Sequence, residues 1–355
     1  MKIREIELRQ LRMPLRVPYV VSTRTITEFD PIVVCAIADD GTEGWGEALI
    51  SPGYTYETRE GAWSFCREAA QRMRGSPLPR ARAAIADQMA ASPGAASALL
   101  AALDMLDDHP LLHATEGRRI PLLAPVQGHA PAEIQDDVAR LIEHGFRTLK
   151  VKVGFDWRAD LERVSLIQTA AQGRATLRLD ANRSYRREDA IAFARGLQPE
   201  GIELFEQPCG SAAWEDNAAV AARSNVPIML DESIYSMDDV RRAAGIEGVD
   251  FIKLKLKKIG SIDMLCDGLA EIRRLGMTPV LGDGMSTEIG CWMEACVASC
   301  AIDNAGEMNG FLKTKDRLFV DALKFADGAV TIPRDYRPRI NRDAVDFHTT
   351  HIEKT

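Results

Sequence analysis

The sequence predicts an α/β protein, a (β/α)7β barrel of the TIM-like type with an α+β capping domain. Its 355 residues exceed the roughly 250 residues of such a barrel. The texture of the sequence changes near residue 120, and beyond it short apolar runs recur about every 25 residues. We therefore expect a capping domain over residues 1–120, a barrel over 121–325, and a C-terminal segment, 326–355, that returns to the cap.

The first part of the cap is expected to be an antiparallel sheet. Charged and apolar residues alternate in IREIEL, and PIVVCAIA is a run of β-branched and apolar residues. A turn at Asp39 to Gly41 separates that run from the next. From Glu57 to about His113 the pattern is helical and is interrupted by prolines. Strands followed by helices predict an α+β cap.

Beyond Pro121 each apolar run is followed by an amphipathic helical stretch, and several of these begin at a serine suited to cap a helix (Ser184, Ser236 or Ser261). Seven or eight such units in about 200 residues fit a closed parallel barrel better than an open sheet. No GxGxxG follows the first strand, which disfavours a doubly wound sheet. The runs are PLLAPVQG, TLKVKVG, TLRLDAN, IELFEQP, IMLDES, DFIKLKLKK and TPVLGDG, with a weaker one near AGEMNG.

Composition excludes several classes of partner. The formal net charge of −8 is spread along the chain without a basic stripe, so nucleic acid is not expected. The first residues lack the apolar stretch of a signal peptide and no 18-residue apolar run follows, which predicts a cytoplasmic protein without a membrane partner. Seven cysteines without a CxxC pair predict reduced thiols. A small-molecule carboxylate is the expected substrate, and a homo-oligomer is the default assembly.

The chemistry is expected at the carboxyl ends of the barrel strands. The inside of a parallel barrel is packed and its outside is covered by helices, so a charge within a strand has no solvated place. The strand ends form the mouth, where such barrels carry their active sites. Successive strand ends here carry Lys150 and Lys152, then Asp180, Glu206 and Asp231, and finally Lys253 and Lys255.

Three acids on consecutive strands predict a metal site. Asp180, Glu206 and Asp231 are oxygen ligands, which suit Mg²⁺ rather than zinc, with Mn²⁺ as an acceptable substitute. Helix capping explains Asp180 or Asp231 singly but not three acids in register. Asn182 and Glu232 are expected to orient these ligands.

The lysines predict acid–base chemistry. Residues two apart on a strand point to the same side, so Lys150 with Lys152 and Lys253 with Lys255 would face each other across the metal. Neighbouring cations, namely the second lysine of each pair and the metal, are expected to lower the pKa of such a lysine until it can act as a base. With a divalent cation stabilising the enediolate, the site would remove a proton next to a carboxylate.

Two more lysines are assigned to a connection rather than to the site. Lys257 and Lys258 are expected in the loop that follows the sixth strand.

These motifs, in this order, resemble the enolase superfamily, specifically the muconate lactonizing enzyme subgroup (mandelate racemase/muconate lactonizing enzyme-like proteins). The resemblance runs from GWGEA at 44–48 through KVKVG, LDAN, FEQP and LDES to the lysine-bearing sixth strand. It implies that the three acids bind Mg²⁺. It also implies that Lys152 is the base on one face of the substrate, with Lys150 beside it, and that Lys255 is the acid/base on the other.

The resemblance also bears on the subgroup and the substrate. The mandelate racemase subgroup uses a His-Asp pair, but the six histidines here lie elsewhere, so that chemistry is disfavoured. Dipeptide epimerases carry Asp-x-Asp-Gly on the eighth strand to hold a substrate ammonium, where this chain has Glu307-Met308-Asn309-Gly310. A cationic or N-substituted amino acid stays open, and a standard dipeptide is disfavoured.

Substrate contacts are expected from the cap loops near Val20–Arg24 and Ser51–Tyr54 and from the later strand ends. Glu288 matches a glutamate common in the subgroup, and Asp283 in GDGMSTE is less usual there. The candidate substrate-binding residues are Arg24, Tyr54, Lys253, Asp283, Glu288, Glu307 and Asn309.

Four functions follow from this pattern. Racemisation or epimerisation of an amino-acid derivative comes first, because lysines on both faces allow removal from one side and return from the other. Muconate-type cycloisomerisation needs proton transfer on one face only. Syn β-elimination, as in succinylbenzoate synthesis, is a third enzymatic alternative. An inactive binding protein that retains the fold is the non-enzyme alternative.

Overall fold

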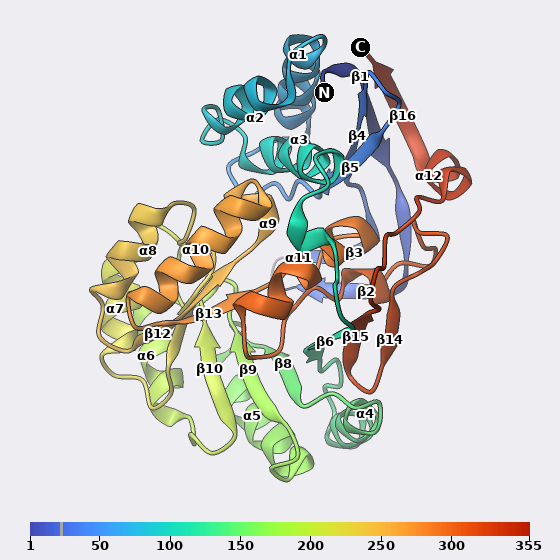
Figure 1. Cartoon of the computed structure of the whole chain (residues 1–355). Helices are drawn as coiled ribbons and strands as arrows, with labels where there is room; N and C mark the ends of the chain where they lie inside the picture. The colour runs from blue at the N-terminus through green and yellow to red at the C-terminus, as the bar shows by residue number, and fades with distance from the viewer. Residues whose placement is uncertain (22–23) are drawn as a thin grey trace.

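The computed structural model describes residues 1–21 and 24–355 and contains a parallel barrel beside an antiparallel sheet with its own helices (Figure 1). The antiparallel sheet has the order β16-β1-β4-β5, from Thr349–Lys354, Ile3–Leu11, Ile32–Ala38 and Glu43–Ala48. β2 (Met13–Val21) and β3 (Arg24–Phe29) form a separate two-stranded sheet that reaches toward the barrel mouth.

Helix α3 packs unusually close to this sheet. The helices of this region are α1 (Arg59–Met73), α2 (Leu78–Ala86) and α3 (Pro93–Leu106). A Cβ at Gly44 or Gly46 on β5 would lie 2.1 or 2.2 Å from a carbonyl oxygen of α3, so only glycine permits the contact. The motif GWGEA therefore sets the distance between sheet and helix, and it places Glu47 at the edge that faces the barrel.

The barrel strands are parallel and adjacent in sequence order, as predicted. The sheet runs β13-β12-β11-β10-β9-β8-β7. Its strands, from β7 to β13, are Ala124–Pro125, Thr148–Lys152, Thr176–Asp180, Ile202–Glu206, Ile228–Leu230, Val249–Leu254 and Thr278–Leu281.

Residues 306 and 307 close the barrel. The predicted eighth strand near AGEMNG is a short bridging segment rather than a regular strand. Gly306 bridges Leu122 in parallel, and the Glu307 N–H donates to the Leu281 carbonyl at 3.0 Å. The segment thus joins both edges of the sheet, which confirms the (β/α)7β prediction.

Helices cover the outer face of the barrel. Ser236 and Ser261 cap α8 and α10 as predicted, with side-chain oxygens that accept from Asp239 N and Met264 N. Ser184 caps nothing, because α6 begins later, at Arg187. The helices in order are α4 (Pro131–Glu143), α5 (Trp157–Ala171), α6 (Arg187–Gly196), α7 (Trp214–Ala221), α8 (Met237–Ala244), α9 (Leu256–Ile259), α10 (Ile262–Arg274) and α11 (Glu288–Ala301).

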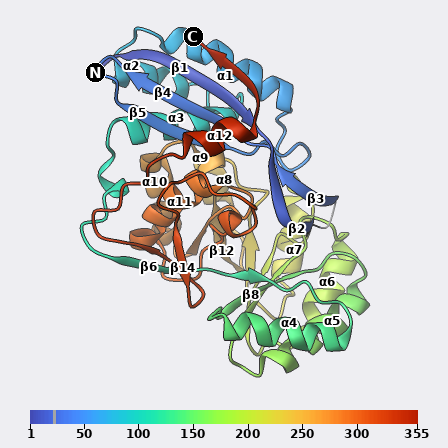
Figure 2. The same cartoon turned by 90° about the vertical axis from the view of Figure 1, so that its right-hand side faces the viewer.

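The C-terminal residues pair with two different sheets. β14 (Lys324–Ala326) and β15 (Ala329–Ile332) form a three-stranded sheet with β6 (Arg118–Pro121), and after α12 (Arg342–His348) strand β16 pairs with β1. Both ends of the chain therefore lie at the same sheet (Figure 2). The domain boundaries at 120 and 325 stay a prediction. The seven cysteines are free thiols, and none of the described helices is long and apolar enough to cross a membrane.

Candidate active site

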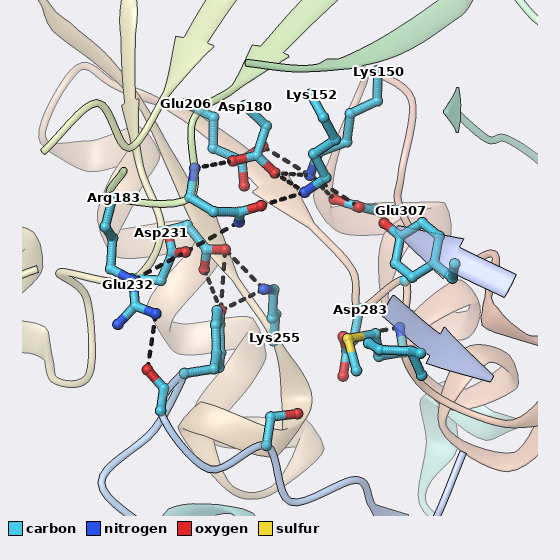
Figure 3. A pocket seen from close by; sticks show the side chains of 18 of the residues that line it. Lys150, Lys152, Asp180, Arg183, Glu206, Asp231, Glu232, Lys255, Asp283 and Glu307 are labelled. Carbon is cyan, nitrogen blue, oxygen red and sulfur yellow. Dashed lines mark hydrogen bonds and ion pairs between the residues drawn. The ribbon is translucent and has the colours of Figure 1, made fainter. Parts of the chain in front are cut away.

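The carboxyl ends of the barrel strands and a loop of the cap enclose one cavity of about 290 Å³ (Figure 3). The cap contributes residues of β2, β3 and the segment from Ser51 to Tyr54. Its charged lining comes from the barrel: Lys150, Lys152, Asp180, Arg183, Glu206, Asp231, Glu232, Lys255, Lys257, Asp283 and Glu307.

On β8, the two predicted lysines point into the cavity and bind carboxylates of neighbouring strands. Lys150 Nζ lies 2.8 Å from Asp180, 2.9 Å from Glu206 and 2.9 Å from Glu307. Lys152 Nζ donates to Asp180 Oδ2 at 2.5 Å and to Asn182 Oδ1 at 2.6 Å. The period of two along the strand brings both ammonium groups to one side, as predicted.

Neighbouring strands in register bring the acids together. Lys152 pairs with Asp180 across β8 and β9, and Asp180 pairs with Glu206 across β9 and β10. Burial would raise the pKa of Asp180, but Lys150 and Lys152 hold it well below its usual range. For Glu206, burial and the adjacent Asp180 raise the pKa. Two buried carboxylates side by side are therefore only partly compensated by the lysines.

A second cluster forms around Asp231, beyond β11. Its Oδ2 lies 2.8 Å from Lys255 Nζ and its Oδ1 3.2 Å from Lys258 Nζ. The Tyr54 hydroxyl donates to Asp231 Oδ1 at 2.9 Å and also contacts Lys255 Nζ, which lies 4.4 Å from the centroid of the same ring. Burial opposes the charge of Asp231, but Lys255 and Lys258 hold its pKa well below its usual range. The prediction that Tyr54 reaches the site agrees with this geometry.

The predicted lowering of the lysine pKa values counted the metal among the neighbouring cations, and the ion-paired side chains alone do not produce it. Burial does lower the pKa of Lys152, but Asp180 outweighs it and the result is a raised pKa. For Lys255, burial is likewise outweighed by Asp231 and then Asp283, and the pKa is raised well above its usual value. The sequence-based argument counted the neighbouring cations and neglected the carboxylates that contact them directly.

Asn182 and Glu232 lie beside the predicted ligands and also line the cavity. Asn182 has φ +42°, and its backbone N–H donates to Asp180 Oδ1 at 2.9 Å. Its Nδ2 donates to Glu232 Oε1 at 3.2 Å, while the buried Glu232 Oε2 accepts no hydrogen bond from any described residue. Burial, followed by the charge of Asp231, raises the pKa of Glu232 to about 7. The two side chains link the cluster at Asp180 to the cluster at Asp231.

The donor chemistry of these acids fits Mg²⁺, although their positions are those of an ion-paired site. Asp180, Glu206 and Asp231 are at most 1 % exposed and line the same cavity with oxygen atoms only. As the described side chains stand, no three acids, histidines or cysteines lie close enough together to hold a metal. Each carboxylate is turned toward a lysine instead.

Sequence reasoning found only part of the outer wall of the cavity, because it named Asp283 but missed Lys257 and Glu294. Lys257 and Lys258 are not in a loop, as predicted, but in the short buried helix α9, which turns their ammonium groups inward. Lys257 Nζ pairs with Asp283 Oδ2 at 2.6 Å, and both line the cavity. Behind them, Glu294 of α11 accepts from Leu256 N at 2.9 Å and from Asp283 N at 2.8 Å. Glu294 follows no strand, so the search of strand ends could not find it.

Several predicted substrate contacts take other positions. Lys253 lies beneath the cavity, 1 % exposed, between Glu206 at 3.1 Å and Glu307. Asn309 Nδ2 donates to the Leu123 carbonyl and its Oδ1 accepts from Lys313 at 2.8 Å, so both of its ends are occupied. Neither Lys253 nor Asn309 is among the described residues that line the cavity.

Glu288 is also directed away from the cavity. Its carboxylate accepts from the backbone N–H groups of Leu318, Phe319 and Leu323 and fixes that loop. The match to a subgroup glutamate therefore predicted a substrate contact where the structure has a loop anchor. The side chain of Arg24 lies outside the described residues.

Comparison with known proteins gives consistent matches. A family model described as enolase C-terminal domain-like matches residues 133–338. The L-Lys-D/L-Arg epimerase of Methylococcus capsulatus is 31% identical over 325 residues, 85% of each chain. The crystal structure of N-succinyl Arg/Lys racemase from Bacillus cereus has a TM-score of 0.90 at 21% identity and covers 100% of both chains. The dipeptide epimerase of Enterococcus faecalis, complexed with Mg and the dipeptide L-Leu-L-Tyr, has a TM-score of 0.84 at 23% identity over 99% of this chain and 100% of that chain.

Proposed function

Because the chain belongs to the enolase superfamily, we propose that it is a Mg²⁺-dependent isomerase of the muconate lactonizing enzyme subgroup that removes and returns a proton next to a carboxylate. The proposed reaction is racemisation or epimerisation of an amino-acid derivative. Relatives named as epimerases and racemases of such compounds support this choice over the other reactions of the subgroup.

One observation carries the proposal: two lysines reach the same cavity from well-separated strands. Lys152 comes from β8 and Lys255 directly follows β12, and β9, β10 and β11 lie between these strands in the sheet. Both lysines line the cavity, and Figure 3 shows them apart from each other, Lys152 beside Asp180 and Lys255 beside Asp231. A substrate carbon held between them could lose a proton to one and gain a proton from the other.

The residues of the chain then have separate tasks. In one direction Lys152 Nζ takes the α-proton as a neutral amine and Lys255 Nζ donates one as an ammonium; the reverse direction exchanges the roles. The cap loop with Tyr54 closes over the site and restricts water. Asp180, Glu206 and Asp231 would hold the metal. When bound, Mg²⁺ supplies positive charge for the substrate carboxylate, whose negative charge grows as the proton leaves.

The test is solvent deuterium incorporation at the α-carbon, followed by mass spectrometry in D₂O over N-acyl amino acids, dipeptides and diacids. We expect exchange into an amino-acid derivative, lost on chelation and restored by Mg²⁺. Mg²⁺ binding measured by calorimetry should weaken in Asp231→Asn, which gives a readout independent of turnover. If no amino-acid derivative exchanges while a muconate-like diacid loses its absorbance, the enzyme is a cycloisomerase instead.

We further propose that the enzyme works in the cytoplasm as a homo-oligomer and accepts Mn²⁺ in place of Mg²⁺. The seven free thiols suit a reducing compartment. Most assemblies of soluble enzymes are symmetric and built from one kind of chain. Light scattering on the purified protein tests the assembly, and metal titration of the chelated protein tests Mn²⁺.

A further inference from the structure

Lys257 and Asp283 form an ion pair on the cavity wall that the proposed proton transfer does not use. Their exposed side-chain fractions are 8 % and 5 %, and the N–O distance is 2.6 Å. Among the described residues, neither side chain bonds to Asp180, Glu206 or Asp231. A buried pair of this kind is costly to desolvate and adds little stability relative to apolar residues. Its place on the wall of the cavity suggests a role in binding.

The structure holds this pair in place from behind. The two carboxylate oxygens of Glu294 each accept one backbone N–H, from Leu256 beside Lys257 and from Asp283 itself. Asp283 Oδ1 accepts from Met285 N at 3.1 Å, whereas the buried Oδ2 has its ion pair but no well-directed hydrogen bond from a described residue. The ammonium of Lys257 and the carboxylate of Asp283 are thus fixed side by side, and Asp283 Oδ2 can still accept a hydrogen bond.

The pair lies next to the lysine that would act on the substrate. Lys255 and Lys257 are two residues apart, and their ammonium groups lie 4.4 and 5.5 Å from the centroid of the Tyr54 ring. A group bonded directly to the reacting carbon would therefore be within reach of Lys257 and Asp283.

On the basis of the proposed function, we infer that Lys257 and Asp283 bind the amide attached to the α-carbon of the substrate. Lys257 donates to the amide carbonyl, and Asp283 accepts from the amide N–H. The substrate class is then the N-acylated amino acid, in which an amide replaces the free ammonium. An ammonium there would be attracted by Asp283 but repelled by Lys257, and a carboxylate would be attracted by Lys257 but repelled by Asp283, whereas a neutral amide meets no like charge.

The eighth-strand segment supports the same class. Glu307 is the only carboxylate in residues 307–310, and it already contacts both Lys150 and Lys253. Asn309 is occupied by Lys313 and Leu123. A free substrate ammonium therefore finds no uncommitted acceptor in this segment, whereas the N–H of an amide would use Asp283 instead.

The test compares two substrates that differ in one group. An N-acetyl amino acid and the O-acetyl hydroxy acid with the same side chain share the α-proton, carboxylate and acyl carbonyl, but the ester lacks the N–H. In the Mg²⁺-loaded enzyme we expect the amide to exchange its α-proton on the order of 10- to 100-fold faster, relative to the same compounds exchanged without enzyme in base.

Variants assign the two halves of the contact. Asp283→Asn should collapse the amide-to-ester ratio toward one, because its acceptor is weakened while the carbonyl contact stays. Lys257→Met should slow both compounds and leave the ratio unchanged, because both carry the carbonyl. Asp303→Asn, at an exposed carboxylate paired with Arg273, is the matched control and should change neither rate.

The outcomes separate this inference from the proposed function. If wild type exchanges both compounds equally, or if Asp283→Asn keeps the wild-type ratio, the amide contact is wrong while the proton transfer stands. If wild type exchanges no amino-acid derivative at all, the proposed function itself fails. Should Asp283→Asn not fold, the double change Lys257→Met with Asp283→Leu removes both charges together, and a retained preference for the amide would overturn the inference.

Discussion

The inner and outer parts of the cavity hold their charges in different ways. In the inner part, the ammonium groups of Lys150 and Lys253 alternate with the carboxylates of Asp180, Glu206 and Glu307, and side chains compensate one another directly. In the outer part, Lys257 and Asp283 come from a short helix and a strand-end loop, and Glu294 accepts the main-chain N–H groups of Leu256 and Asp283.

This difference in how the charges are held assigns proton transfer to the inner part and substrate selectivity to the outer part. An inner network of contacting charges tolerates few changes, because each removal leaves a buried partner without compensation. The outer ion pair of Lys257 and Asp283 makes no hydrogen bond or ion pair with Asp180, Glu206 or Asp231 among the described residues, so a change to this pair leaves the partners of those acids in place. The inner part is suited to a fixed proton transfer and the outer part to substrate choice. The following experiments test that division, from the largest expected effect to the smallest.

Removal of either reacting lysine should have the largest effect. Lys152→Ala and Lys255→Ala should each lower racemisation by about 10³-fold or more, because general acid–base catalysis contributes about 10²- to 10⁴-fold at each step. Each variant should still exchange the α-proton of the one enantiomer that faces its remaining lysine. Proton NMR in D₂O, started from each enantiomer separately, checks this. Equal loss with both enantiomers would mean that the lysines do not act on opposite faces.

Loss of Lys253 should destabilise the inner part of the cavity and leave the ion pair of the outer part unchanged. Lys253→Met leaves the buried Glu206 and Glu307 short of one cation, and we expect a loss of about 3–5 kcal/mol in the free energy of unfolding. Urea unfolding measures it, with Lys324→Met at an exposed position as the matched control. Adding Glu307→Gln should recover part of the loss. A stability equal to wild type would show that the inner charges are independent.

The contact between cap and barrel should depend on pH through Glu47. Its carboxylate accepts from Thr287 N, Thr287 Oγ1 and Gly290 N at the start of α11. Burial, only partly offset by these bonds, raises its pKa from 4.5 to about 7. The folded state therefore holds this proton more tightly than the unfolded state does. Stability from Glu47 is fully present below pH 4.5 and is lost as the pH rises to about 7.

The measurement is the free energy of unfolding from pH 4 to pH 8 for wild type and Glu47→Gln. The glutamine does not titrate, so the difference between the two curves should change by about 3 kcal/mol across that window. A constant difference would show that Glu47 titrates alike in both states. α-Proton exchange at one pH serves as the control for an intact inner site.

Tyr54→Phe should have the smallest effect, because it removes one hydroxyl and keeps the ring over Lys255. The hydroxyl contacts both Asp231 and Lys255, and we expect kcat to fall about 10-fold, since a hydrogen bond to a charged group contributes about 1.5–3 kcal/mol. Tyr56→Phe, whose hydroxyl contacts only the Ala90 carbonyl among the described residues, is the matched control. An unchanged kcat would place Tyr54 among the residues that merely cover the site.

The inner part of the cavity could be predicted from sequence because strand register controls it. Lys152, Asp180 and Glu206 are in-register neighbours on consecutive strands, and a parallel barrel allows charges at few places other than the strand ends. The fold was predictable for the same reason, since each apolar run marks a strand.

Of the outer part, Asp283 was named as a candidate at a strand end, but its neighbours could not be predicted in this way. Lys257 turns inward only because α9 forms directly after β12, and Glu294 acts from the interior of a helix. Glu288 shows the opposite error, because a motif match does not reveal that three backbone amides occupy the carboxylate. Local spacing carries no information about such contacts between distant segments.

The pairing of β16 with β1 has a consequence for synthesis on the ribosome. Glu7 on β1 faces Lys354 on β16, 347 residues later in the chain. β1 therefore leaves the ribosome early and keeps one unpaired edge while the whole barrel between the two strands is translated. An open strand edge is a site of aggregation until its partner arrives. Nascent chains stalled before residue 349 should thus depend on chaperones even after their barrel has folded.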